Sequence, residues 1–190
     1  MSNPIVWWVI AAVLLFWALG AYNRLVRLRS EAKTAFALLD AELLQQTELV
    51  HASLPASLIH TGLTQPGDLL DEVTTLWSGL RAAATQLSNS VAAMRPRPLD
   101  RDAAAALSEA HAVLHGAWTR VSSEANDLAG SSMPEDLTKR WQLLSTQARL
   151  ATVRFNEAVA SYNEAIGQFP AMLLATLFAF KPAGVIRAEA

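Results

Sequence analysis

The feature that most constrains this chain is an uncharged apolar run that enters a long helical pattern without a break. Residues 4–22 (PIVWWVIAAVLLFWALGAY) contain no charged side chain. As a helix this run is about 28 Å long, which is close to the ~30 Å hydrocarbon core of a bilayer. Only Gly20 interrupts the passage into residues 24–54, which keep a helical period. The sequence therefore predicts one continuous helix, partly in lipid and partly in water.

The charges beside the apolar run predict its orientation. Basic side chains follow the run at Arg24, Arg27, Arg29 and Lys33, whereas none precedes it. Because basic residues favour the cytoplasmic side, we expect the N-terminus outside and the rest of the chain in the cytoplasm. A cleavable signal peptide is the alternative, since residues 18–20 (ALG) fit a cleavage site, although no basic region precedes the run.

Aromatic residues lie near both ends of the run, where amphipathic rings suit the two membrane–water interfaces. They are Trp7 and Trp8 near one end, and Trp17 and Tyr22 near the other. A lipid-facing position is the alternative for Trp17. We expect the span to begin at Pro4 and residues 1–23 to form a transmembrane anchor.

Composition excludes several classes of protein. With 15 Lys+Arg against 17 Asp+Glu, the net charge of −2 offers no basic excess for phosphate backbones, so no nucleic-acid partner is expected. The absence of cysteine excludes disulfides, thiolate metal sites and a lipid-modified cysteine. We expect one domain over residues 24–170, followed by an apolar segment and tail over residues 171–190.

Apolar side chains recur at spacings of three and four along the whole domain, with no strand-like alternation. The predicted helices cover residues 24–54, 68–94, 100–128 and 134–169, with Asp100 as an N-cap and Pro134 in the first turn. Breaks are predicted at Pro55 with residues 61–67, at residues 95–98, at residues 130–132 and at Pro170. The last three helices each carry a tryptophan at a core position: Trp77, Trp118 and Trp141. The predicted fold is all-α, with the transmembrane helix continuing into an antiparallel up-down-up-down four-helix bundle.

This topology returns the last helix to the membrane, so Phe169 is expected near the bilayer. Residues 165–180 are uncharged and contain Pro170, which makes them a poor second span. Two interpretations remain open for Met172, Leu173, Leu177 and Phe178. They cap the open end of the bundle, or they enter lipid or a partner protein.

Helix geometry also suggests an ion pair. Asp40 lies ~27 Å beyond Tyr22, and Arg149 lies ~30 Å before Phe169, at 1.5 Å per residue. We therefore expect Asp40 and Arg149 to pair between the first and last helices, with two separate solvated charges as the alternative.

Catalytic and metal-binding patterns are weak. His111 and His115 share a helix face, but the spacing His-Ala-Val-Leu-His lacks the glutamate base of a zinc hydrolase. His111 lies at a core position of the predicted helix, so we interpret it as a packed, hydrogen-bonded histidine. We expect no catalytic residue, no cofactor and no metal; a metal-dependent activity at this pair and a ligand-sensing bundle are the alternatives.

Both ends of the domain carry motifs of a known family. They are residues 22–29 (YNRLVRLR), 39–43 (LDAEL), 148–151 (ARLA), 155–159 (FNEAV), 162–166 (YNEAI), 168–170 (QFP) and 173–182 (LLATLFAFKP). These segments resemble the opening and the close of LemA family proteins. The matching positions taken as structural are Tyr22, Asn23, Arg29, Asp40, Arg149, Tyr162, Asn163, Phe169, Pro170, Phe178, Phe180 and Pro182. The chain departs from the family at residues 45–52 (QQTELVHA), where a basic pair and DLIPNLV are usual, and its proline comes later, at Pro55.

The resemblance implies a bacterial membrane-anchored helical bundle with no assigned catalytic residues. Family members are described beside membrane metalloproteases, and relatives take part in magnetosome membrane organisation. We therefore predict a single-pass protein of the cell (cytoplasmic) membrane that acts as a scaffold or adaptor. Its expected partners are the lipid bilayer and a membrane protein such as a protease, and self-association is left open.

Overall fold

The computed structural model describes residues 4–53, 68–129 and 134–187, and these residues form helices and no strand. The helices are α1 (Pro4–Ala52), α3 (Asp68–Met94), α4 (Arg101–Ala129), α5 (Glu135–Gly167) and α6 (Ala171–Leu177). The all-α prediction is confirmed for this part of the chain. The predicted breaks at Pro55, at residues 61–67 and at residues 130–132 lie outside the described residues.

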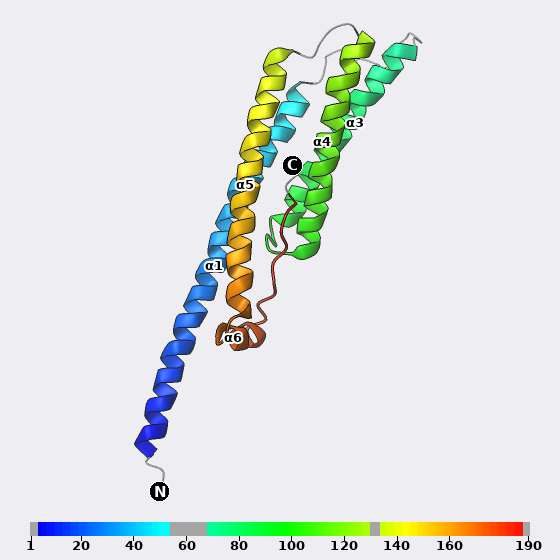
Figure 1. Ribbon diagram of the computed structural model, residues 1–190. Helices are drawn as coiled ribbons and strands as arrows, with labels where there is room; N and C mark the ends of the chain where they lie inside the picture. The colour runs from blue at the N-terminus through cyan, green and yellow to red at the C-terminus, as the bar shows by residue number, and fades with distance from the viewer. Residues whose placement is uncertain (1–3, 54–67, 130–133, 188–190) are drawn as a thin grey trace.

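Helix α1 is continuous over 49 residues, as the apolar run predicted. Gly20 does not interrupt it, because one glycine inside a helix costs only about 1 kcal/mol relative to alanine. The N-terminal part projects beyond the other helices, whereas the C-terminal part packs among them (Figure 1). The helix is long and apolar enough to cross a membrane, and none of its most apolar stretch is buried in the protein. Its exposed side chains include Trp7 and Trp8, the latter with 78% of its surface accessible.

Two helix pairs make up the body of the molecule. Helix α1 packs along α5, α3 packs along α4, and α1 also contacts α3 (Figure 1). The four long helices share one apolar core, in which Phe155 and Tyr162 are among the largest fully buried side chains. Trp118 of α4 stacks on Trp141 of α5, with ring centroids 4.2 Å apart. Trp77, Trp118 and Trp141 are all buried, so their predicted core positions are confirmed.

Local chemistry explains the helix ends. The Asp100 Oδ1 accepts hydrogen bonds from the N–H groups of Asp102 (3.1 Å) and Ala103 (3.0 Å), which confirms Asp100 as the N-cap of α4. Pro134 precedes α5 and does not form its first turn as predicted, because its ψ of 128° is not helical. Helix α5 stops at Gly167, before the break predicted at Pro170. A residue that precedes proline disfavours helical geometry, and Phe169 is in that position.

The chain reverses direction after α5. The short helix α6 packs against α1 and α5, and residues 180–187 then run back along the molecule in an extended conformation (Figure 1). We call residues 180–187 the strap. A Schellman-type turn connects α6 to the strap, since the N–H of Phe180 bonds to the carbonyl of Ala175 at 2.8 Å. Ala179 occupies the left-handed position of this turn with a φ of 52°.

Candidate functional site

Large apolar side chains are exposed where α5 meets α6. Helix α6 buries only its small residues Ala171 and Ala175 against the body. The exposed side chains are Phe169 (69%), Met172 (47%), Leu173 (59%), Leu177 (75%) and Phe178 (54%), and we call this set the apolar platform. Since Met172, Leu173, Leu177 and Phe178 face solvent, they do not cap the core, and the alanines close that end.

Aromatic contacts join the platform to the end of the apolar run of α1. The rings of Trp17 and Phe169 lie 5.3 Å apart, and those of Tyr22 and Phe178 lie 5.1 Å apart. Tyr22 also contacts Phe180 at 6.3 Å between centroids. The platform is therefore level with the predicted interfacial residues of α1, and Trp17 is packed on one side by Phe169. Pro170 immediately precedes α6.

Two further positions from the family motif lie on the same part of α1. Asn23 is exposed, and Arg29 places its guanidinium carbon 5.6 Å from the ring centroid of Phe180. A cation above an aromatic face is attracted by the ring quadrupole. Arg29 thus holds the start of the strap against α1.

Asn163 fixes the strap to α5. Its Nδ2 donates to the carbonyl of Ala183 at 3.0 Å, and its Oδ1 accepts the Ala183 N–H at 2.7 Å. The hydroxyl of Tyr162 donates to the carbonyl of Lys181 at 3.1 Å. Burial raises the pKa of Tyr162, so this hydroxyl stays protonated as a donor. Pro182 lies exposed between these two contacts.

A second asparagine repeats the same clamp and was not singled out from the sequence. Asn156 donates to the carbonyl of Ile186 at 2.7 Å and accepts its N–H at 2.9 Å. The signal that could have identified it is a repeat of seven residues, because FNEAV at 155–159 recurs as YNEAI at 162–166. Residues seven apart lie on one helix face, so both amides point at one strap.

Asp40 pairs with a different helix from the one we expected. Its carboxylate accepts two hydrogen bonds of 2.9 Å from Arg95, which directly follows α3. Arg149 is exposed and lines a separate cleft, so the predicted pair between Asp40 and Arg149 is wrong. Equal heights along two helices do not determine which faces meet, and the face of α1 that carries Asp40 turns toward α3.

A buried polar network lies inside the body. Gln46 of α1 is fully buried; its Nε2 donates to Ser145 Oγ at 3.2 Å, and its Oε1 lies 3.3 Å from His111 Nε2. Burial, with a smaller effect of His115, lowers the pKa of His111 to about 4. His111 is thus neutral at pH 7, and its Nε2 carries the proton, because an amide oxygen can only accept. In the sequence, the sign of this network is a glutamine at a core position between Leu43 and Val50, which the sequence analysis did not use.

The second histidine lines an open cleft of about 580 Å³ between α4 and α5, together with Trp141 and Arg149. The rings of His111 and His115 lie 4.6 Å apart in an edge-on arrangement. Among the described residues, no group of three His, Cys, Asp or Glu side chains is placed to hold a metal ion.

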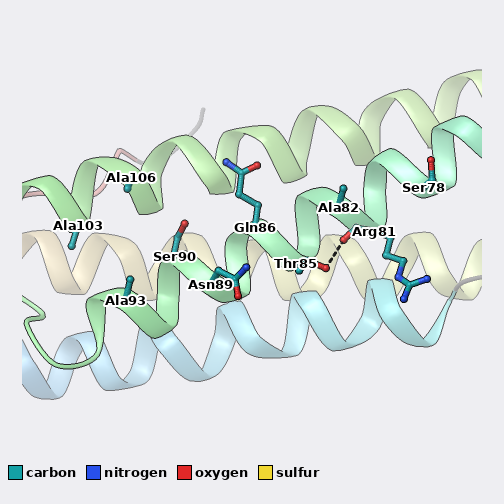
Figure 2. A pocket seen from close by; sticks show the side chains of 10 residues that line it. All are labelled: Ser78, Arg81, Ala82, Thr85, Gln86, Asn89, Ser90, Ala93, Ala103 and Ala106. Atoms are coloured by element: carbon teal, nitrogen blue, oxygen red, sulfur yellow. Dashed lines mark hydrogen bonds between the residues drawn. The ribbon is translucent and has the colours of Figure 1, made fainter.

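A larger groove of about 640 Å³ runs along α3 beside α4 (Figure 2). Alanine, serine and amide side chains of α3 face Ala103 and Ala106 of α4. Among the described residues that line it, Arg81 is the one charged side chain, and no acid–base pair is present. The platform, unlike this groove, is an exposed apolar surface, and such surfaces mark interaction sites.

Comparison with known proteins identifies a family. A family model described as LemA family matches residues 56–190, a region that includes α3, α4, α5, α6 and the strap. The motifs at residues 148–182 fall within this region, whereas those at residues 22–43 precede it. No curated protein and no solved structure matches the chain.

Proposed function

The chain belongs to the LemA family, and we propose that it is a membrane-anchored helical scaffold or adaptor that acts by binding rather than by catalysis. In this proposal residues 4–22 cross the cell membrane once, with the N-terminus outside. Residues 24–170 form an antiparallel up-down-up-down four-helix bundle in the cytoplasm. The unburied apolar half of α1 and the basic residues that follow it support this arrangement.

The exposed apolar platform is the observation that carries the proposal. Full burial of one such side chain is favourable by about 1.5–3 kcal/mol, so water is a poor solvent for the whole set. The contacts of Trp17 with Phe169 and of Tyr22 with Phe178 support this proposal, because they join the platform to the C-terminal end of the apolar run of α1. Apolar side chains at that level enter the headgroup boundary or a neighbouring membrane protein.

Two attachments to the membrane then determine what the bundle can do. The anchor confines the bundle to a plane and raises its effective concentration for membrane partners. The platform adds a second contact and limits how far the bundle tilts. The partner class that we propose is a membrane protein, with a membrane protease as the first candidate and self-association as the other.

Crosslinking in cells tests this proposal directly. A photo-reactive residue replaces Phe178 in the full chain, and a matched variant carries it at Leu143, which is similarly exposed (59%) on α5 but far from α6. We expect position 178 to crosslink to lipid or to a membrane protein, and position 143 to give neither product by mass spectrometry. Products from position 178 that join only α1 or α5 of the same chain would contradict the proposal.

A membrane-tethered ligand sensor is the second candidate function. The cleft lined by His115, Trp141 and Arg149 favours it, because a cationic side chain beside an aromatic ring suits a small anionic aromatic ligand. The test is thermal melting of the full chain with benzoate and indole acetate, compared with an Arg149→Gln variant. A rise in melting temperature that the variant loses would support sensing, and equal melting curves would exclude these ligands.

A further inference from the structure

A pocket of about 310 Å³ lies between α1, the turn at residues 95–100 and the beginning of the strap. Four cationic side chains line it: Arg29 and Lys33 from α1, Arg97 from the turn, and Lys181 from the strap. Tyr162 also lines it, and Asp100 is the only carboxylate among the described lining residues. The pocket therefore combines four positive charges with one negative charge.

None of the four cations has a carboxylate partner within ion-pair distance in the described part of the chain. The neighbouring Arg95 shows the contrast, because it pairs with Asp40 at 2.9 Å. Asp100 offsets only one of the four charges, and its Oδ1 accepts the N–H groups of Asp102 and Ala103. Like charges in excess of their counter-charge repel one another, and a bound anion relieves that repulsion.

Two of the pocket cations act on Asp100. The N–H of Ala103 is the main cause that lowers its pKa, and the positive charges of Arg97 and Lys181 lower it further. The turn and the strap come from distant parts of the sequence, and folding holds their charges beside the same carboxylate. The positive field therefore belongs to the folded pocket.

In the proposed membrane arrangement, the pocket also lies close to the level of the membrane surface. Arg29 follows Tyr22 by seven residues, which is about 10 Å along a helix. The Phe180 ring contacts both Tyr22 (6.3 Å between centroids) and the guanidinium of Arg29 (5.6 Å). Phe180 thus lines the cationic pocket and also contacts an aromatic residue at the end of the apolar run. The headgroups of anionic lipids gather where basic residues lie just outside the hydrocarbon core.

We propose that this pocket binds a phosphate group, supplied by the headgroup of an anionic phospholipid. The planar guanidinium groups of Arg29 and Arg97 can each donate two parallel hydrogen bonds to phosphate oxygens. Lys33 and Lys181 add compact positive charges that stabilise the same anion. The lipid source rests on the proposed membrane anchoring, whereas recognition of phosphate itself does not.

Lipid retention by the full chain tests the proposal. The chain is placed in nanodiscs of phosphatidylcholine with a minor fraction of phosphatidylglycerol, and the lipids that stay bound are counted by native mass spectrometry. The test variant is Arg97→Gln with Lys181→Gln. The matched control is Arg120→Gln with Arg140→Gln, which removes the same charge from exposed arginines of α4 and α5 outside the pocket.

We expect one retained phosphatidylglycerol for the unmodified chain and for the control, and at least a tenfold loss for the test variant. Helix content measured by circular dichroism should be equal in all three, since the replaced side chains are exposed. Equal retention in all three proteins would overturn the proposal, because the pocket charges would then not hold the lipid. Equal loss in both variants would also overturn it, because general charge would then explain the binding.

A second arm distinguishes lipid from free phosphate. Inorganic phosphate is titrated by calorimetry into the full chain in neutral detergent micelles. Phosphate binding that requires Arg97 and Lys181, without retained phosphatidylglycerol, would support the anion site and assign its ligand to solution. Absence of both signals would overturn the site. The crosslinking result at Phe178 is independent, because neither Arg97 nor Lys181 belongs to the platform.

Discussion

The side-chain amide of Asn163 pairs with both backbone groups of Ala183, as one strand residue pairs with another. Its Nδ2 donates to the Ala183 carbonyl and its Oδ1 accepts the Ala183 N–H, at 3.0 and 2.7 Å. Asn156 makes the same two bonds with Ile186. The helix α5 therefore satisfies the backbone of an extended segment without a sheet.

Replacement of Asn163 by aspartate should loosen the strap. Aspartate keeps the acceptor for the Ala183 N–H but places a carboxylate oxygen against the Ala183 carbonyl. We expect a loss of about 1–3 kcal/mol in unfolding free energy, measured by urea denaturation in micelles. Amide hydrogen exchange at Ala183 should also become faster. The control Asn89→Asp changes an exposed residue of α3, and an equal effect of both variants would contradict the clamp.

Gly184 should tolerate no side chain. A Cβ at this position would lie 2.7 Å from the Cα of Arg101, and a backbone atom cannot move aside as a side-chain tip can. We expect Gly184→Ala to lower the unfolding free energy by about 1–3 kcal/mol and to speed amide hydrogen exchange at Ile186. Gly116→Ala is the control; it lies in open space within α4 and should gain about 1 kcal/mol. Similar melting curves for the two variants would show that the strap is not packed as described.

Ala179→Gly should stabilise the protein. Ala179 has a φ of 52°, which costs an L-residue about 1–2 kcal/mol and a glycine almost nothing. Glycine also loses more entropy on folding, so we expect a net gain of about 0.5–1 kcal/mol. Thermal melting measures it, and Ala160→Gly, at an exposed interior position of α5, should instead lose about 1 kcal/mol. A loss of stability in Ala179→Gly would argue against the left-handed turn.

The pair of Asp40 with Arg95 should appear as a coupling energy. The Asp40 side chain is largely buried and the Arg95 side chain is half exposed, so we expect about 0.5–1 kcal/mol from a double-mutant cycle with alanine. The parallel cycle of Asp40 with Arg149 should give a coupling near zero. A larger coupling energy for Asp40 with Arg149 than for Asp40 with Arg95 would contradict the pairing seen in the structure.

Stability should depend on pH through His111. Its pKa is near 4 in the folded protein and 6.5 when unfolded, so between these values the unfolded chain binds more protons. The contribution is therefore complete above pH 6.5 and is lost as the pH falls toward 4. We expect about 2 kcal/mol less stability from this group at pH 5 than at pH 7. His111→Gln should flatten this decline in urea denaturation, whereas the exposed His51→Gln should leave it unchanged.

Periodicity and composition determined much of the fold. The apolar run followed by a stripe at spacings of three and four predicted α1 as one helix, because no proline or pair of glycines interrupts it. Local rules also identified the Asp100 cap, the end of α3 at Met94 and the core positions of Trp77, Trp118 and Trp141. The family motifs at residues 148–182 were sufficient to indicate the family that the comparison confirms.

Only the tertiary structure decided which faces meet. An apolar stripe shows that a helix face is buried but not which helix lies opposite. Heights along the helices therefore suggested a pair of Asp40 with Arg149, whereas the structure pairs Asp40 with Arg95. Hydrophobicity alone did not decide whether Met172, Leu173, Leu177 and Phe178 are buried against the bundle or exposed. In the structure α6 buries its alanines instead, because only small side chains allow it to approach α1 and α5 closely. The asparagine clamps and the cationic pocket join segments far apart in sequence. Such sites arise from the path of the strap, which no local pattern encodes.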